Sequence, residues 1–101
     1  MRVISVRALR EFWESHKRGA AAEQPLKAWY AEAKTAQWLS PSDVKATYGH
    51  NVSILKDGRA VFDIKGNDYR LVVRINYAFG IVFVRFIGTH AEYDQIDAQT
   101  I

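Results

Sequence analysis

The chain of 101 residues contains no cysteine. It therefore cannot form a disulfide framework, a Cys-liganded zinc or iron–sulfur site, or a thiol nucleophile. Long hydrophobic runs are also missing, since charges interrupt every apolar stretch of the N-terminal MRVISVRALREFW. We thus expect neither a signal peptide nor a membrane span. The absence of cysteine fits a reducing compartment, and together with the missing apolar runs it leads us to expect a cytoplasmic protein.

The motifs of several cofactor-dependent and nucleophilic enzymes are absent as well. The sequence has no P-loop, no G-x-G-x-x-G after a strand and no G-x-S-x-G elbow. Its three histidines, His16, His50 and His90, are scattered without a spacing such as H-E-x-x-H. We expect no metal and no cofactor, and we interpret His16 and His50 as surface residues without a functional role.

The composition is that of one folded domain spanning residues 1–101. Apolar residues make up 49% and charged residues 25%, which excludes the polar, low-aromatic signature of disorder. The net charge of +3 is a weak indication of a polyanionic partner. Its distribution is more informative, because the segment 65–89 contains four cationic side chains and only one acidic one, Asp68. The last twelve residues, 90–101, contain three acids and no Lys or Arg.

Hydrophobic periodicity predicts helices followed by strands, which is an α+β order. A short, partly β-branched run predicts a first strand at 2–5. Apolar stripes with start and stop signals predict three helices, at about 6–17, from Pro25 onward, and from Pro41 to Gly49. After Val52 the pattern changes to strands, which we place at 52–55, 60–65, 69–76 and 81–88. The short connections between them require antiparallel pairing. Thr89-His90-Ala91-Glu92 matches a capping box and predicts a short terminal helix.

Alternation along the strand 69–76 separates two faces. Tyr69, Leu71, Val73 and Ile75 form the core set, and Arg70 and Arg74 point the other way. Either arginine could be no more than a solvated charge on an exposed sheet face. The alternative is that they form part of an anion-binding surface.

Arg85 interrupts the apolar run IVFVRFIG. A charge within such a strand is usually paired or functional. Two interpretations remain open: an ion pair with Asp63 or Asp68, or a functional role.

His90 and Tyr93 are three residues apart at the start of the terminal helix and so share one side of it. Both could be ordinary surface or packing residues. Their position next to the arginine-bearing strands makes them candidates for proton transfer.

Cations, one histidine and one or two tyrosines suit a particular reaction, the transesterification of a phosphodiester. A ribose 2′-OH attacks the adjacent phosphate, cationic side chains neutralise the charge that develops, and a positioned group moves protons. Cleavage of RNA by this route needs no metal.

The segments VFDIKGNDYRLVVRINY and IVFVRFIGTHAEYDQIDA resemble the HigB toxins of the RelE superfamily, which belong to bacterial toxin-antitoxin systems. The resemblance spans about Val61 to Ala98. It implies a RelE-like fold, in which N-terminal helices pack on one face of a twisted antiparallel sheet and a short helix ends the chain. It also implies a ribosome-dependent endoribonuclease (mRNA interferase) that inhibits translation, with mRNA, the 70S ribosome and a HigA-type helix-turn-helix antitoxin as partners.

By this resemblance Arg70 and Arg85 occupy the positions of phosphate-contacting arginines, and His90 and Tyr93 those of acid/base candidates. We take these four as the catalytic set. We add as RNA-binding residues Lys65, Arg74, Lys56 and Arg59. Two alternatives to an active nuclease are a non-catalytic RNA- or ribosome-binding module and a toxin that has lost its activity.

Overall fold

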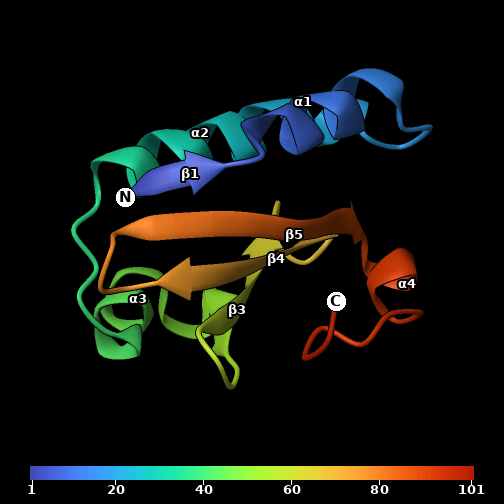
Figure 1. Cartoon of the computed structure of the whole chain (residues 1–101). Coiled ribbons are helices and arrows are strands. Elements are labelled where there is room, and N and C mark those ends of the chain that lie inside the picture. The colour runs from blue at the N-terminus through green and yellow to red at the C-terminus, as the bar shows by residue number, and fades with distance from the viewer.

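The centre of the fold is β4 (Tyr69–Asn76), which pairs antiparallel with β3 (Arg59–Ile64) on one side and β5 (Ile81–Thr89) on the other. These elements belong to a computed structural model that describes residues 1–101 (Figure 1). The others are β1 (Arg2–Ile4), α1 (Val6–Ser15), α2 (Glu23–Thr35), α3 (Pro41–Tyr48), β2 (Val52–Ile54) and α4 (His90–Tyr93). Short 3₁₀ turns, Ala20–Ala22 and Gly49–Asn51, precede α2 and β2.

The five strands form one sheet in the order β1-β5-β4-β3-β2. The four later strands are an antiparallel meander, as expected from their short connections. β1 instead joins β5 in parallel, so the sheet as a whole is mixed. The α+β class is confirmed, with N-terminal helices before the meander and a short helix after it.

One face of the sheet carries the main hydrophobic core. Leu9 of α1, Leu26 and Trp29 of α2, and Val44 of α3 pack there against the sheet. The strands contribute the alternating set predicted for β4, together with their neighbours: Ala60, Phe62, Ile64, Tyr69, Leu71, Val73, Ile75 and Val82. The helices are amphipathic, so burying their apolar sides on this face removes them from water.

The opposite face is partly covered by residues 94–101, which we call the C-terminal segment. Ala98 of this segment lies in a small second core with Val61 of β3 and Val72 of β4. Val72 is fully buried although it alternates with the core set. The face that bears Arg70 and Arg74 is therefore not a simple solvated surface.

A β-bulge interrupts the pairing of β4 with β5. Val72 lies opposite Phe86, but the next residue, Val73, lies opposite Val84. Arg85 is therefore the extra residue of the bulged strand. This explains how a charged residue fits within an apolar run, because the bulge removes it from the regular alternation.

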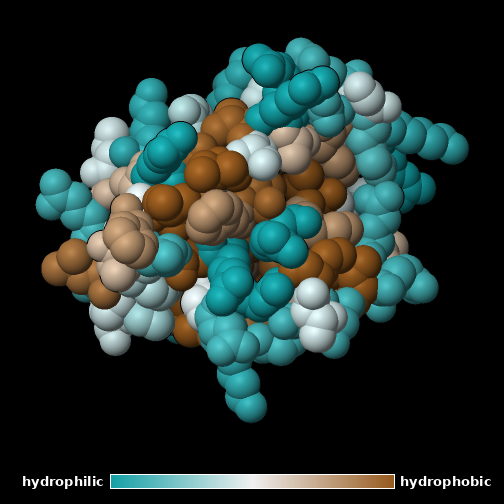
Figure 2. Space-filling view, in the orientation of Figure 1, coloured by the Kyte–Doolittle hydropathy of each residue, from teal (hydrophilic) through white to brown (hydrophobic).

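Hydrophobic side chains remain partly exposed around β1 and β5. Ile4 pairs in register with Phe83, and both, like Ile81, are only partly buried. Figure 2 shows hydrophobic side chains gathered in the middle of one face of the molecule, with hydrophilic ones toward the rim. No helix combines the length and apolar character that crossing a membrane requires.

The helix and turn signals are mostly reproduced. The Thr89 hydroxyl oxygen accepts a hydrogen bond from the Glu92 N–H, and the Glu92 carboxylate accepts one from the Thr89 N–H, which completes the expected capping box. Ser40 holds the N-cap position of α3 without a side-chain bond, and the Asp43 carboxylate accepts from the N–H of Leu39 instead. At the turn between β2 and β3, Asp57 and Gly58 both have positive φ, as the Asp-Gly signal predicts.

Gly58 offers a test of the sheet, because a Cβ there would lie 2.4 Å from the main-chain oxygen of Ile75. Gly66 has a similar φ of +66° but open space around it. Gly66→Ala should lower the free energy of unfolding by about 1 kcal/mol, the cost of the left-handed conformation. Gly58→Ala should cost about 1–3 kcal/mol more through steric overlap. Urea unfolding measures both, and equal losses would contradict the close approach of this turn to β4.

Candidate functional site

Arg70 is held on two sides. Its Nη1 lies 3.1 Å from Oδ1 of Asp63, which is directly opposite in the β3–β4 register. Its Cζ lies 5.3 Å from the centre of the Tyr93 ring of α4. The side chain is only 18% exposed, and its buried Nε has no hydrogen-bond partner. Arg70 is therefore not the solvated surface charge that was the alternative interpretation.

Asp63 is a residue of this site that the sequence interpretation missed as the partner of Arg70. The sequence pattern instead offers Asp63 as a partner of Arg85. The signal was present, since the turn after Ile64 sets a register in which the two residues face each other. An ion pair at a half-buried position limits the rotamers of Arg70 and so fixes its direction.

His90 and Tyr93 have different surroundings although both lie on α4. The Tyr93 ring packs against Arg70 and belongs to the small core under the C-terminal segment. The His90 side chain is 47% exposed, and its Nε2 lies 3.6 Å from Oδ2 of Asp94. No hydrogen bond or ion pair joins it to Arg70 or Tyr93.

The β3–β4 turn lies against the start of α4. The main-chain N–H of His90 donates to the carbonyl oxygen of Asp68, and Nζ of Lys65 is 3.5 Å from the Asp68 carboxylate. A shallow hollow of about 410 Å³ opens here, lined in part by Asp68, Thr89 and His90. Lys65 and His90 thus lie around the same turn, both well exposed.

Arg85 contacts the C-terminal segment. Its Nε donates to the main-chain oxygen of Ile101 at 3.2 Å. The expected alternative, an ion pair with Asp63 or Asp68, is wrong, because these acids pair with Arg70 and Lys65 respectively. Arg85 forms no ion pair with either of them. Its terminal Nη groups have no hydrogen-bond partner in the protein.

Arg59 and Lys56 also contact the C-terminal segment. Nη1 of Arg59 donates to the main-chain oxygens of Ala98 and Ile101. The main chain of Lys56 exchanges two hydrogen bonds with the side-chain amide of Gln99, while its ammonium group forms none. Arg59 is therefore committed to a structural contact, and Lys56 remains a free cation at a turn.

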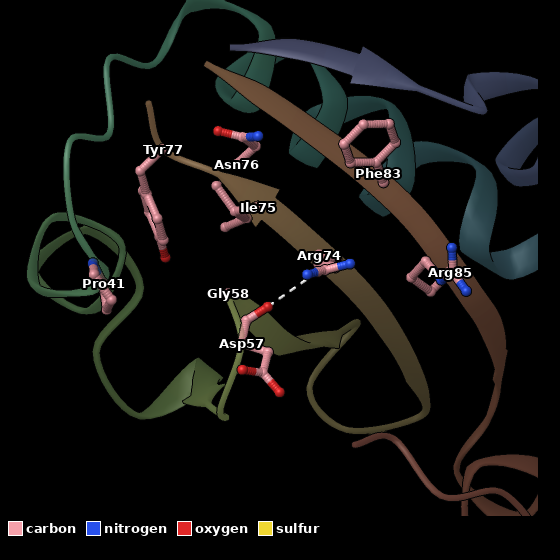
Figure 3. A pocket seen from close by; sticks show the side chains of 9 residues that line it. All are labelled: Pro41, Asp57, Gly58, Arg74, Ile75, Asn76, Tyr77, Phe83 and Arg85. Carbon is pink, nitrogen blue, oxygen red and sulfur yellow. Dashed lines mark hydrogen bonds between the residues drawn. The ribbon is translucent and has the colours of Figure 1, made fainter. Parts of the chain in front are cut away.

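Arg74 lies beside Arg85 in a cleft of about 640 Å³ (Figure 3). Its Nε donates to the main-chain oxygen of Asp57 at 3.1 Å, which leaves both Nη groups unpaired. The structure thus brings the predicted residues into three groups. Tyr93 packs on Arg70. Lys65 and His90 lie around the β3–β4 turn. Arg74 and Arg85 lie in the cleft.

His16 has a role that the sequence interpretation did not predict. Its Nε2 lies 2.9 Å from Oε2 of Glu92, and its Nδ1 accepts the main-chain N–H of Arg18 at 2.9 Å. Nε2 therefore carries the proton and donates to the carboxylate. This bond and the Thr89 N–H hold the pKa of Glu92 below its ordinary value. A separation of 76 residues left no local signal for the contact.

Comparison with known proteins assigns the family. The model of the HigB toxin family, described as the RelE-like toxic component of a toxin-antitoxin system, matches residues 22–96. The chain belongs to the HigB toxin family. As a HigB family member it is the toxic component of a toxin-antitoxin system and has an antitoxin partner. No curated protein matches the sequence.

The match to the HigB family includes every candidate residue of the site. Residues 22–96 contain β2 to β5 and α4, and therefore Arg70, Arg85, His90 and Tyr93. Most of the C-terminal segment and all of α1 lie outside it. The contacts that His16 and Ile101 make with this region thus come from outside the matched residues.

The bond between His16 and Glu92 predicts an effect of acid on stability. Because folding lowers the Glu92 pKa from 4.5, its stabilising contribution is present above 4.5 and is lost as the pH falls through the lower, folded-state pKa. His16→Ala should raise the folded pKa toward 4.5 and make the acid-induced loss of stability less steep. NMR titration of the Glu92 carboxyl carbon and thermal unfolding measure these quantities.

His50→Ala is the matched control, because His50 is exposed and forms no side-chain hydrogen bond. It should leave the Glu92 titration unchanged. An unchanged titration in His16→Ala as well would mean that the contact contributes nothing in solution.

Proposed function

We propose that this toxin is a metal-independent endoribonuclease that cleaves translated mRNA on the 70S ribosome and so inhibits translation in the cytoplasm. The 2′-OH beside the scissile phosphate is the nucleophile. A 2′,3′-cyclic phosphate and a free 5′-OH are the products. The antitoxin, proposed to be a HigA-type helix-turn-helix protein, opposes this activity.

The observation that carries the proposal is the environment of Arg70. A guanidinium fixed between a carboxylate and an aromatic ring can meet a phosphate without first losing rotamer freedom. Charge stabilisation by prearranged donors is commonly the largest contribution to catalysis. Arg85, with free Nη groups on the same face of the sheet, supplies the second cation.

We assign roles to the other candidate residues from the exposure of their side chains and the contacts they make. Lys65 assists at the turn, and either His90 or Tyr93 transfers the proton. His90 is the more accessible of the two, whereas Tyr93 also orients Arg70. Arg74 and Lys56 attract RNA electrostatically. Arg59 belonged to this predicted set, but its contact with the C-terminal segment makes its proposed part indirect.

Dependence on the ribosome agrees with the openness of the site. His90 and Lys65 are each about half exposed, and neither lies in an enclosed cavity. Such a face does little by itself to align a flexible RNA with the catalytic groups. A ribosome that holds the message against this face would provide the missing alignment.

Variants at the two arginines test the proposal. Arg70→Ala alone would leave Asp63 half-buried without its partner, so the double variant Asp63→Asn/Arg70→Gln is preferable. This variant and Arg85→Ala should each reduce mRNA cleavage about 100-fold or more, which is typical for loss of a transition-state donor. Primer extension on mRNA after induction, together with growth, measures the effect.

Arg7→Ala is the control, because Arg7 lies on α1 with an 81% exposed side chain. It should arrest growth as the parent does. Both site variants must be shown to fold by thermal unfolding. If the folded variants still cut mRNA as fast as the parent, the assigned site is wrong.

Cleavage itself separates the proposal from a non-catalytic RNA- or ribosome-binding module. Basic strands with interleaved aromatic residues also favour such a module. The enzyme should produce discrete breaks in ribosome-bound mRNA with 2′,3′-cyclic phosphate and free 5′-OH ends, the products of the metal-independent route. Ribosomes stalled on intact mRNA would identify a binding module. Normal growth after induction would identify an inactive toxin.

A further inference from the structure

We infer that the cleft between β4, β5 and the β2–β3 turn is a nucleotide-binding subsite, which holds one unstacked base of the RNA beside the scissile phosphate. The inference rests on the proposed function, because Arg85 belongs both to the catalytic set and to the wall of this cleft. It adds a binding site and a determinant of sequence preference that the nuclease activity alone does not require.

The size of the cleft fits this ligand. Its volume of about 640 Å³ is within the range of small-ligand sites, about 300–1,000 Å³. A single nucleotide is a ligand of this class. Figure 3 shows the cleft running along β4, with Arg85 toward one end and Tyr77 and Pro41 at the other.

The charges at one end fit a phosphodiester. Arg74 and Arg85 each use Nε on a main-chain oxygen, at 3.1 Å and 3.2 Å respectively. These bonds hold the side chains while the Nη groups stay unpaired. Asp57 is the one acid among the lining residues. Its main-chain oxygen bonds Arg74, and Figure 3 shows its carboxylate pointing away from Arg74.

The walls fit a base rather than a second phosphate. Phe83 of β5 is partly exposed and offers an aromatic surface beside the two arginines. Unstacked RNA bases are commonly held by aromatic rings and guanidinium planes. Phe83 also adjoins the partly exposed apolar side chain of Ile4, so the surface beyond the cleft is apolar as well.

Polar groups at the far end could distinguish bases. Oδ1 of Asn76 accepts a hydrogen bond from the N–H of Phe79 at 3.1 Å. The amide nitrogen of Asn76 is therefore the donor that remains available to a ligand. Burial and the nearby Asp43 raise the pKa of Tyr77, so its phenol stays protonated and can also donate. Both donors suit a base edge that presents hydrogen-bond acceptors.

Substitution of Phe83 tests the stacking surface. Phe83→Leu keeps an apolar side chain but removes the ring, and Phe79→Leu is the matched control, since Phe79 is 79% exposed outside the cleft. The probe is a short fluorescein-labelled RNA with methylated 2′-hydroxyls, which binds but cannot be cleaved. Phe83→Leu should weaken its binding about tenfold, as expected for loss of one stacked base. Phe79→Leu should bind as the parent does.

Substitution of Asn76 tests base preference independently of core packing. Asn76→Asp keeps the oxygen that accepts from Phe79 and replaces the free donor with an acceptor. Sequencing of 5′ ends after induction should show a changed base preference at one position beside the cut. A folded Phe83→Leu variant with parental binding, or an Asn76→Asp variant with parental cleavage sites, would overturn the subsite.

The two proposals fail in different ways. A parent protein that binds the methylated RNA through Phe83 but never cuts mRNA would refute the nuclease and keep the subsite. If the parent cuts mRNA, but Phe83→Leu does not change RNA binding and Asn76→Asp does not change base preference, only the subsite is refuted and the nuclease stands. If Phe83→Leu loses antitoxin binding and retains RNA binding, the cleft is a protein-docking surface and the inference is wrong.

Discussion

The antiparallel register of β3 against β4 determines where the charged side chains of the sheet lie. It places Asp63 directly opposite Arg70, and Phe62 opposite Leu71. Because side chains alternate at every residue, a shift of one position would move the apolar set away from the helices and Arg70 into the core. Burial of Phe62, Leu71 and Val73 under the helices therefore fixes the ion pair on the opposite face.

The opposite face combines packing and charge. Val61 and Val72 at its centre pack against Ala98 of the C-terminal segment. Arg59 and Arg85 bind main-chain oxygens of that same segment and thus keep it against the sheet. Basic residues on this face consequently serve two purposes. Some hold the segment, while Arg74 and Arg85 retain unpaired Nη groups that an anionic ligand can reach.

The position of α4 depends on contacts from three parts of the chain. The capping box gives the helix its first turn, the Asp68 carbonyl accepts the N–H of His90, and His16 of the α1 end binds Glu92. Tyr93 then packs on Arg70. The proposed proton-transfer groups are thus held relative to the proposed phosphate-binding arginine by several modest contacts. None of these side chains lies in an enclosed pocket, which agrees with the proposed substrate, an mRNA held by the ribosome.

The sequence correctly predicts the order of helices and strands, the capping box at Thr89 and the division of β4 into a core set and an arginine-bearing set. These features depend on residues close together in the chain, where periodicity and turn residues are sufficient signals. It also carried the resemblance to the family that the comparison later established. Three features arise only when the chain folds: Arg70 pairs with Asp63, a bulge accommodates Arg85 against the C-terminal segment, and His16 contacts Glu92. These contacts join residues whose proximity arises from strand register and chain packing, which no local pattern encodes.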